Sequence, residues 1–213
     1  MSSDSVAAIT SDARRHTDDV PRNRRQEETF RKVLTAGMEM LRESSYADLT
    51  VRAVAKRANV APATAYTYFS SKNHLVAEVY LDLVKQVPFF TDVNDSMLIR
   101  VDSVLRHLAL VVADYPEVAA ACTTALMSGG DPAVLTVRDR IGAEIHRRIV
   151  SAIGPDGDPR TVDALQMTFF GALVQAGSGA FTYRQIADRL TYVVNLILSG
   201  GGTGKPTDPG GKQ

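Results

Sequence analysis

The chain is poor in the features that support disulfide, membrane and secretory chemistry. Its 213 residues include a single cysteine, Cys122, which excludes an intrachain disulfide and any multi-cysteine metal site. No uninterrupted apolar run approaches the roughly 20 residues that a helix needs to cross a bilayer. The N-terminus is polar and lacks the apolar segment of a secretory signal. The sequence therefore predicts a cytoplasmic protein that has no membrane partner.

Catalytic groups are scarce as well. The four histidines, His16, His74, His107 and His146, are far apart in the chain and show no metal-ligand spacing. No serine or cysteine stands in a nucleophile elbow. An enzyme needs a nucleophile, a base and an acid that converge. We therefore expect that the chain is not an enzyme and that it needs no metal and no cofactor.

The C-terminal stretch from Gly200, GGTGKPTDPGGKQ, has the glycines and the lysine of a phosphate-binding loop. The spacing fails, because Ser199 stands where the motif needs its first glycine. Pro206 follows Lys205 where the motif needs Ser or Thr. We therefore expect residues 200–213 to form a flexible tail. Residues 1–21, which are rich in Ser, Asp and Ala, are expected to be disordered.

The charge is balanced overall but unevenly distributed. The formal net charge is zero, yet residues 22–74 hold ten Lys or Arg against five Asp or Glu, a local +5, so the remaining residues carry −5. A basic head on an acidic body is typical of a protein that meets DNA at one end. A charge run is more often only a solvated face, so the asymmetry supports DNA binding without establishing it.

Apolar residues recur at three- and four-residue steps through most of the chain, and no alternating strand pattern is present. Phe30, Val33, Leu34 and Leu41 predict one amphipathic helix. A linking helix is expected from Leu75 up to Pro88, and further helices over about 101–112, 132–154, 160–177 and 182–197. The sequence therefore predicts an all-α fold of about nine helices.

Residues 49–69 read LTVRAVAKRANVAPATAYTYF, which indicates two short helices joined by a tight turn. Thr50 is a good N-cap for the first helix. Asn59 is expected in the left-handed conformation that ends this helix, since Asn tolerates positive φ better than most residues. Pro62 suits the first turn of the second helix, where its missing N–H costs nothing. This pattern predicts a helix-turn-helix.

The second helix presents a surface of small side chains and one aromatic, namely Ala61, Ala63, Thr64, Tyr66 and Thr67. Small residues allow a helix to lie deep in a major groove, and Thr and Tyr can contact bases or phosphates. Two tyrosines two positions apart, Tyr66 and Tyr68, cannot share one buried face of a helix. This spacing favours DNA contact over a purely structural role.

The segment resembles the DNA-binding domain of the TetR family of transcriptional regulators. The matching positions are Thr50, Val51, Ala55, Ala58, Val60, Thr64, Tyr66, Tyr68, Phe69, Ser71, Lys72 and Leu75. The departures are Val54 for Ile, Asn59 for the turn Gly, Ala61 for Ser, Ala63 for Gly and Ala65 for a larger apolar residue. Loss of the Ser at position 61 removes a side-chain cap from the second helix.

The resemblance implies a helix-turn-helix domain over residues 22–70 that binds an operator in double-stranded DNA. In the family, Tyr66 and Tyr68 would donate to phosphates or bases, Phe69 would pack inward, and Ser71 would cap the next helix with Lys72 at its first turn. A basic leader before the domain is expected to reach the minor groove or phosphates. The candidate DNA-binding residues are Arg22, Arg24, Arg25, Thr50, Arg52, Ala61, Pro62, Ala63, Thr64, Tyr66, Thr67, Tyr68 and Lys72.

The resemblance also implies a helical domain over residues 71–199 that forms a homodimer and holds a small-molecule effector. In the family, the last two helices pair across a two-fold axis. The candidate interface residues are Leu165, Phe169, Ala172, Leu173, Ala176, Val193, Val194 and Ile197. The candidate pocket residues are Phe89, Leu105, Leu108, Val112, Cys122, Leu126, Met127, Met167 and Phe170.

Two questions stay open from the sequence. The apolar residues of the second domain can belong to an ordinary core instead of a pocket or an interface, and a helical adaptor that binds protein instead of DNA remains an alternative. If a pocket exists, its lining is apolar, aromatic and sulfur-rich, which favours a lipophilic ligand. We expect a dimeric repressor whose effector tilts the linking helix, from Lys72 to Val87, and moves the two DNA-binding heads apart.

Overall fold

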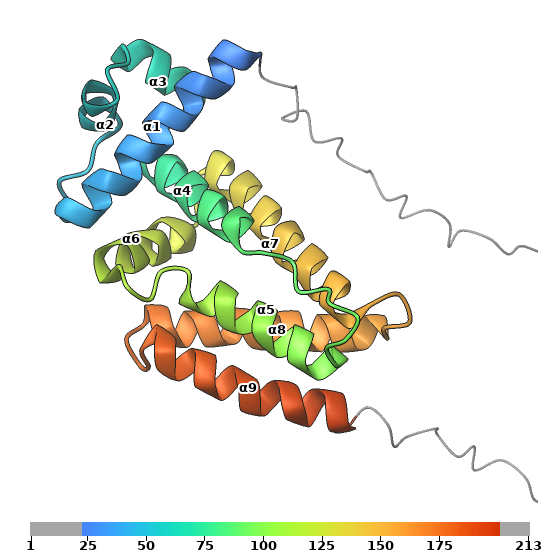
Figure 1. The fold of residues 1–213 in the computed structure, drawn as a ribbon. Helices are drawn as coiled ribbons and strands as arrows, with labels where there is room; N and C mark the ends of the chain where they lie inside the picture. Colours follow the sequence, from blue (N-terminus) through green and yellow to red (C-terminus); the bar gives the residue numbers. More distant parts are fainter. Residues whose placement is uncertain (1–22, 201–213) are drawn as a thin grey trace, which may run out of the picture.

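A computed structural model describes residues 23–200 and contains, within that range, nine α-helices and no strand (Figure 1). The prediction of an all-α fold is confirmed. The tails that the sequence predicts to be disordered or flexible, residues 1–21 and the part of 200–213 beyond Gly200, lie outside the described residues. Gly200 itself ends the last helix.

The first three helices form a small head. Their bounds are α1 Arg24–Glu43, α2 Val51–Arg57 and α3 Pro62–Tyr68. The predicted stripe on α1 is buried, and the Phe30 ring stacks on Phe69 from the end of α3 at a centroid distance of 5.0 Å. Thr50 caps α2 as predicted, because its side chain accepts a hydrogen bond from the Ala53 N–H. Ala61 supplies no side-chain cap to α3.

The linking helix α4, Lys72–Gln86, connects the head to the body. The body consists of α5 Met97–Leu110, α6 Pro116–Met127, α7 Pro132–Ile153, α8 Pro159–Gly177 and α9 Tyr183–Gly200. Helix α4 packs against α1 on the head side and against α6 and α7 on the body side. A run from Leu75 to Leu81 is buried without a break, so most of the surface of α4 in this stretch is covered.

Side chains and a glycine define several helix ends in the body. Asp131 accepts a hydrogen bond from the Ala133 N–H before Pro132 opens α7, and Gly154 ends this helix at φ 97°. Thr182 and Gln185 exchange hydrogen bonds at the start of α9, which makes a capping box.

Helix α6 has no counterpart among the ranges that the sequence predicts. Its residues include four alanines and a cysteine, and small side chains of this kind give little amphipathic contrast. Three of these alanines and Cys122 are nevertheless buried. Gly177 of α8 lies so close to α6 that an added Cβ would stand 2.6 Å from the Thr123 side chain. Small residues therefore bring α6 and α8 together within one chain.

Among residues 23–200, no helix combines the length and the apolarity that a membrane span requires.

Candidate nucleic-acid interface and internal cavity

The turn between α2 and α3 depends on one residue in the left-handed conformation. Asn59 has φ 54°, and it is the sole non-glycine residue with positive φ within residues 23–200. The turn lets the Val60 N–H donate to the Ala55 carbonyl at 2.9 Å, which closes the end of α2. The predicted role of Asn59 in place of a turn glycine is confirmed.

Helix α3 presents nearly all of its residues to solvent. Ala65 is the buried residue of this helix, with no exposed surface. Tyr66 is 51% exposed, although a large aromatic side chain is usually covered in a folded chain. The other predicted contact residues on this surface are also exposed, namely Ala61, Pro62, Ala63, Thr64 and Thr67. The structure thus brings the predicted reading face together on one side of the head.

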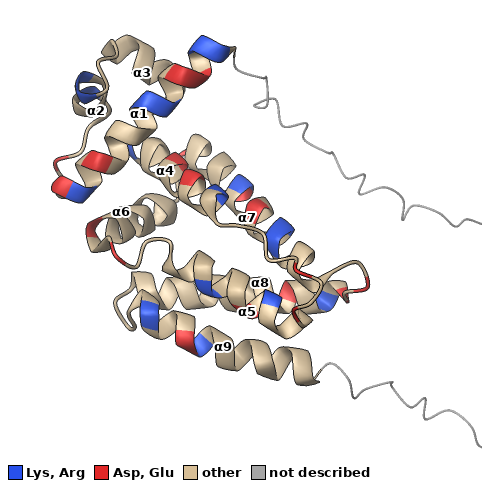
Figure 2. Cartoon of the chain, viewed as in Figure 1, with Lys and Arg blue, Asp and Glu red and all other residues tan. Residues whose placement is uncertain are grey.

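A shallow groove runs beside this face, between the start of α2 and the start of α3. It holds about 660 Å³ and is lined in part by the exposed cations Arg52 and Lys56. Thr50, Asn59 and Pro62 line it too. Lys56 is not among the residues that the sequence predicts to contact DNA, yet it shares the groove with Arg52, which is. In Figure 2 the blue of Lys and Arg marks the start of α1 and part of α2.

Arg57, the third cation of α2, pairs with acids of α1. Its guanidinium donates to the Glu39 carboxylate at 3.1 Å and to Glu43 at 2.7 Å, so it ties α2 to the end of α1. The hydrogen bond from Arg57 lowers the pKa of Glu43, and the two glutamates raise the pKa of Arg57. These acids therefore do not cancel the charge of Arg52 and Lys56 in the groove.

Two predicted DNA contacts also have partners inside the chain. Tyr68 is half-buried, and its ring meets Phe30 edge-on at 6.1 Å. The Lys72 ammonium donates to the Tyr46 carbonyl at 3.2 Å and lies 4.3 Å from the centre of the Tyr46 ring. DNA contact by Tyr68 and Lys72 stays a prediction, and it would compete with these internal contacts.

The basic leader is described in part. Arg24 is exposed and pairs with Glu28 one helical turn later, at 3.2 Å. Arg25 is exposed on the same first turn of α1. Arg22 lies outside the described residues.

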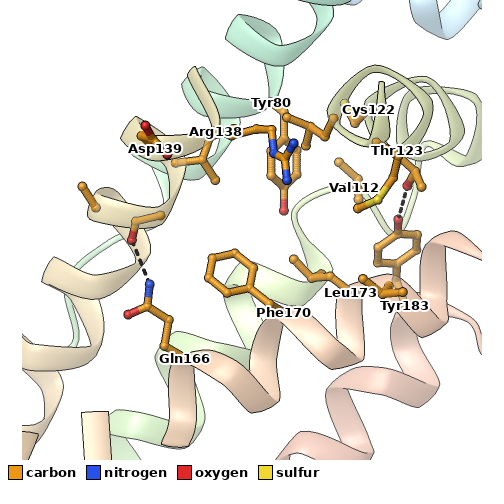
Figure 3. Close-up of a pocket in the computed structure, with 16 residues that line it drawn as sticks. Tyr80, Val112, Cys122, Thr123, Arg138, Asp139, Gln166, Phe170, Leu173 and Tyr183 are labelled. Carbon is orange, nitrogen blue, oxygen red and sulfur yellow. Dashed lines mark hydrogen bonds between the residues drawn. The ribbon is translucent and has the colours of Figure 1, made fainter. Parts of the chain in front are cut away.

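The body contains a cavity of about 620 Å³, lined mainly by residues of α4, α6, α7 and α8 (Figure 3). Its volume lies within the range of about 300–1,000 Å³ typical of small-molecule sites. Five of the predicted pocket residues line it, namely Val112, Cys122, Leu126, Met127 and Phe170. Burial raises the pKa of the Cys122 thiol to about 12, so this group is a neutral part of the wall.

Four predicted pocket residues lie elsewhere, and their assignment is corrected. Leu105 and Leu108 are fully buried on α5 and fill the core between helices. Phe89 is 47% exposed beyond the end of α4, where its ring covers the Arg148 guanidinium at 4.6 Å. Met167 is 75% exposed on the outer face of α8. The helical spacing of apolar residues predicts an apolar face, but it does not predict whether that face meets the core, a cavity or solvent.

The cavity also has polar groups that the sequence analysis did not identify. Tyr80 and Tyr183 contribute hydroxyls, and Gln166, Arg138 and Asp139 lie on its wall. Gln166 donates to the Gly142 carbonyl at 3.3 Å and its oxygen lies 2.9 Å from a ring nitrogen of His146. Neither His107 nor His146 lines the cavity. The remaining unanticipated lining residues are Thr123, Ile141, Gly142, Ala143, Leu173 and Val174.

The predicted dimer residues divide into two groups. Leu165, Phe169, Ala176 and Val194 are buried within the single chain, with at most 8% exposure, so they cannot supply much contact to a second copy. Ala172, Leu173, Val193 and Ile197 are half-buried. The exposed apolar residues of α8 and α9 are different ones, namely Met167, Val174, Tyr192 and Leu196, each at least half exposed.

A set of hydrogen bonds, here called the polar junction, joins the start of α4 to the α6–α7 connection and the head. The Ser71 hydroxyl donates to the Asp131 carboxylate at 2.6 Å, and the Asn73 amide donates to the Ser128 hydroxyl at 3.0 Å. The Tyr46 hydroxyl of the head donates to the Asn73 amide oxygen. The hydrogen bond from Ser71 lowers the pKa of Asp131.

The other end of α4 is held by a buried arginine. Arg148 of α7, which is 2% exposed, donates to the Val87 carbonyl at 3.0 Å and to the Lys85 carbonyl at 3.0 Å. Its guanidinium also pairs with Glu144. Burial of Glu144 acts to raise its pKa, but the hydrogen bonds from Arg148 and Arg147 prevail, and the pKa lies below its ordinary value.

Within residues 23–200 no group of three or more His, Cys, Asp or Glu side chains is arranged to hold a metal ion.

Known proteins similar to this chain are regulators of transcription. The family described as bacterial regulatory proteins of the tetR family matches residues 33–79. An HTH-type transcriptional regulator of Mycobacterium tuberculosis is 72% identical over 205 residues, which cover 94% of this chain and 95% of the relative. The HTH-type transcriptional repressor KstR of Rhodococcus jostii is 27% identical over 192 residues, 86% of this chain and 89% of the relative.

Solved structures share the fold. A TetR transcriptional regulator from Rhodococcus has a TM-score of 0.69 at 22% identity, covering 83% of this chain and 98% of that one. The TetR-family repressor FadR of Thermus thermophilus, solved in complex with lauroyl-CoA, has a TM-score of 0.61 at 15% identity, covering 85% and 100%. At these identities the likeness concerns the arrangement of the helices.

Proposed function

Because the chain belongs to the TetR family of bacterial transcriptional regulators, we propose that it is a homodimeric repressor that a lipophilic small molecule releases from its operator. Regulation of transcription through a DNA-binding helix-turn-helix is common to the family and its relatives, which are not enzymes. The proposal concerns the finer points: which residues contact DNA, how two copies pair, and what the cavity accepts.

The observation that carries the proposal is the exposed face of α3. Seven residues form this helix, and one of them, Ala65, anchors it to the core. Tyr66 at 51% exposure and Thr64 stand on the outer face, next to the groove that holds Arg52. We assign base contacts to Thr64 and Tyr66, and phosphate contacts to Arg52.

Dimerisation is proposed through the outer face of α8 and α9. Met167 at 75%, Tyr192 at 67%, Leu196 at 56% and Val174 at 51% are unusually exposed for apolar side chains. They lie on two helices that pack against each other, and we propose that they contribute to one apolar surface. A second copy placed there would make a four-helix interface with two-fold symmetry. A dimer of this kind presents two copies of α3 to successive half-sites.

The effector is proposed to occupy the cavity. Its walls include Val112, Leu126, Met127, Ile141 and Phe170, which favour a lipophilic molecule. FadR of Thermus thermophilus shares the fold and was solved with lauroyl-CoA, and KstR of Rhodococcus jostii is a repressor. Both relationships support an effector-responsive repressor here.

The polar junction offers a route from the cavity to the head. Leu126 and Met127 line the cavity immediately before Ser128, and Arg138 lines it on the helix that Asp131 caps. Ser128 and Asp131 bond to the start of α4. A ligand that moves the end of α6 would therefore move Ser71 and Asn73, and with them the head. The ligand can shift this equilibrium only by the difference between its affinities for the two states.

Operator binding is tested with DNA fragments selected from the genome of the host organism. Tyr66→Ala should weaken binding about 5- to 150-fold, since one good base contact contributes ~1–3 kcal/mol, and should leave the dimer mass unchanged in sedimentation. Tyr192→Ala serves as the matched variant, an exposed tyrosine on the proposed dimer face, and should raise the dimer dissociation constant. Binding that resists raised salt, or a dimer that Tyr192→Ala does not weaken, would contradict the corresponding part of the proposal.

A further inference from the structure

The side chain of Tyr80 is largely buried, and its hydroxyl faces the cavity. Tyr80 is 5% exposed, and its hydroxyl points into the cavity in Figure 3. No hydrogen bond to this hydroxyl is present among residues 23–200, whereas the hydroxyl of Tyr183 on the opposite wall lies 3.5 Å from that of Thr123. Burial raises the pKa of Tyr80, so the group remains a hydrogen-bond donor. The hydroxyl faces the cavity with its donor uncommitted to the protein, and an oxygen of a ligand there would accept its hydrogen bond.

One arginine at the wall of the cavity also lacks a partner. Helix α7 carries four arginines, and three of them pair with carboxylates: Arg140 with Glu78, and both Arg147 and Arg148 with Glu144. Arg138 is the exception among the described residues of this helix. It is exposed at the cavity and makes no ion pair there. Its charge is therefore available to an anion.

The neighbouring acid does not occupy the same space. Asp139 also lines the cavity, but in Figure 3 its carboxylate points away from the centre, whereas the Arg138 side chain extends from α7 toward Tyr80. The rest of the lining is mainly hydrocarbon from α6, α7 and α8. The cavity thus combines a mainly apolar lining with the Tyr80 hydroxyl and the Arg138 guanidinium, neither of which is paired within residues 23–200.

Resting on the proposed effector function, we propose that the effector is an anionic amphiphile. Its hydrocarbon body fills the cavity, an oxygen next to that body accepts the hydrogen bond of Tyr80, and its anionic group pairs with Arg138. A free carboxylic acid and an acyl thioester of a nucleotide-bearing carrier both have this chemistry. In the acid the carboxylate supplies both the acceptor and the charge. In the thioester the carbonyl is the acceptor and a phosphate carries the charge.

The proposal is tested by calorimetric titration of the full chain with probes of one hydrocarbon length. Dodecanoate should bind about fivefold tighter than dodecanol, since an ion pair at an exposed site contributes a modest factor, and dodecyltrimethylammonium should bind more weakly than either. Arg138→Gln should remove the preference for the anion. Arg160→Gln, which changes an exposed arginine outside the cavity, should leave it intact. Tyr80→Phe should weaken dodecanoate about fivefold without altering the cavity walls.

The outcomes separate this inference from the proposed function. If dodecanol binds as tightly as dodecanoate, or if Arg138→Gln keeps the preference, the headgroup assignment is wrong while a lipophilic effector stands. If none of the probes binds, the lipophilic effector itself falls and this inference falls with it. Tighter binding of dodecanoyl-CoA than of dodecanoate, lost in Arg138→Gln, identifies the thioester as the source, and the reverse order identifies the free acid.

Discussion

The two ends of α4 are held in contrasting ways. At its start, the polar junction joins side chain to side chain through Ser71 and Asn73, which are only partly buried. At its end, the 2% exposed guanidinium of Arg148 donates to backbone carbonyls and pairs with the buried Glu144. Water can replace the bonds at the start at little cost, but it cannot reach those at the end.

This difference bears on which end of α4 would act as the pivot in the proposed motion. A rigid helix that is fixed at one end and loosely bonded at the other moves most at the loose end. The loose end of α4 carries the head, and it bonds to the connection between α6 and α7 that borders the cavity. The fixed end at Val87 and Lys85 would act as the pivot for the proposed motion.

The largest expected effect on stability comes from removing the Arg148 side chain, which holds the end of α4. Arg148→Ala leaves Glu144 buried and two carbonyls unpaired, and should lower the free energy of unfolding by about 3 kcal/mol. For a chain of this size that corresponds to a fall in Tm of about 6–12 °C, which differential scanning calorimetry would measure. Arg147, whose side chain is 62% exposed, is the other partner of Glu144. Arg147→Ala should therefore cost less than about 1 kcal/mol. Equal losses in the two variants would contradict the contrast.

A smaller effect on stability is expected at the start of α4. Asn73→Ala removes the bonds to Ser128 and Tyr46 and should cost about 1 kcal/mol. If the junction carries the signal, operator affinity should become less sensitive to ligand, which a mobility-shift titration with and without effector would measure. Gln86→Ala, which loses one exposed bond to Asp82 within α4, is the control. An unchanged ligand response in Asn73→Ala would place the coupling elsewhere.

The junction should also depend on pH. The folded-state pKa of Asp131 lies below its ordinary value of 3.8, first through the hydrogen bond from Ser71. A carboxyl whose pKa is lowered on folding contributes stability above its unfolded pKa, and that contribution is lost as the pH falls through the folded pKa. Asp131→Asn keeps the cap but not the charge, so wild type should be more stable at pH 7 by up to about 1 kcal/mol. Urea unfolding should show this margin shrinking at acid pH below 3.8; a constant margin would exclude the carboxylate.

The smallest expected change separates two cations of the head. Arg52→Ala should reduce the salt dependence of operator binding by about one unit of slope, as expected for one phosphate contact. Lys72 already contacts Tyr46, so Lys72→Ala should reduce the slope less. Fluorescence anisotropy at several salt concentrations would measure both. A full unit for Lys72 would mean that its ammonium leaves Tyr46 when DNA binds.

The head could be predicted from the sequence because its determinants are local. Thr50, Asn59 and Ser71 each set the backbone of their immediate neighbours, and the structure gives all three the expected roles. Their geometry depends on a few adjacent residues rather than on the rest of the fold. The actual DNA contacts of the head remain predictions.

The body could be predicted less well because its determinants are distant in the chain. Leu108 and Val112 have the same helical period, yet one fills the core and the other borders the cavity. On α8 the most regular apolar residues, Leu165 and Phe169, face inward, and Met167 faces solvent. A periodic pattern identifies an apolar stripe, but the neighbouring helices decide whether a core, a void or solvent lies opposite.

Tyr80 belongs to α4 itself, so the hydroxyl at the cavity wall is carried by the helix that is proposed to move. Binding in the cavity and release of the protein from DNA would then be separate properties of a compound. A molecule that accepts the hydrogen bond of Tyr80 contacts α4 directly, whereas one that only fills the space between α6 and α8 competes for the site without displacing α4. The first would act as an inducer and the second as an antagonist, and the two would differ by a single oxygen atom.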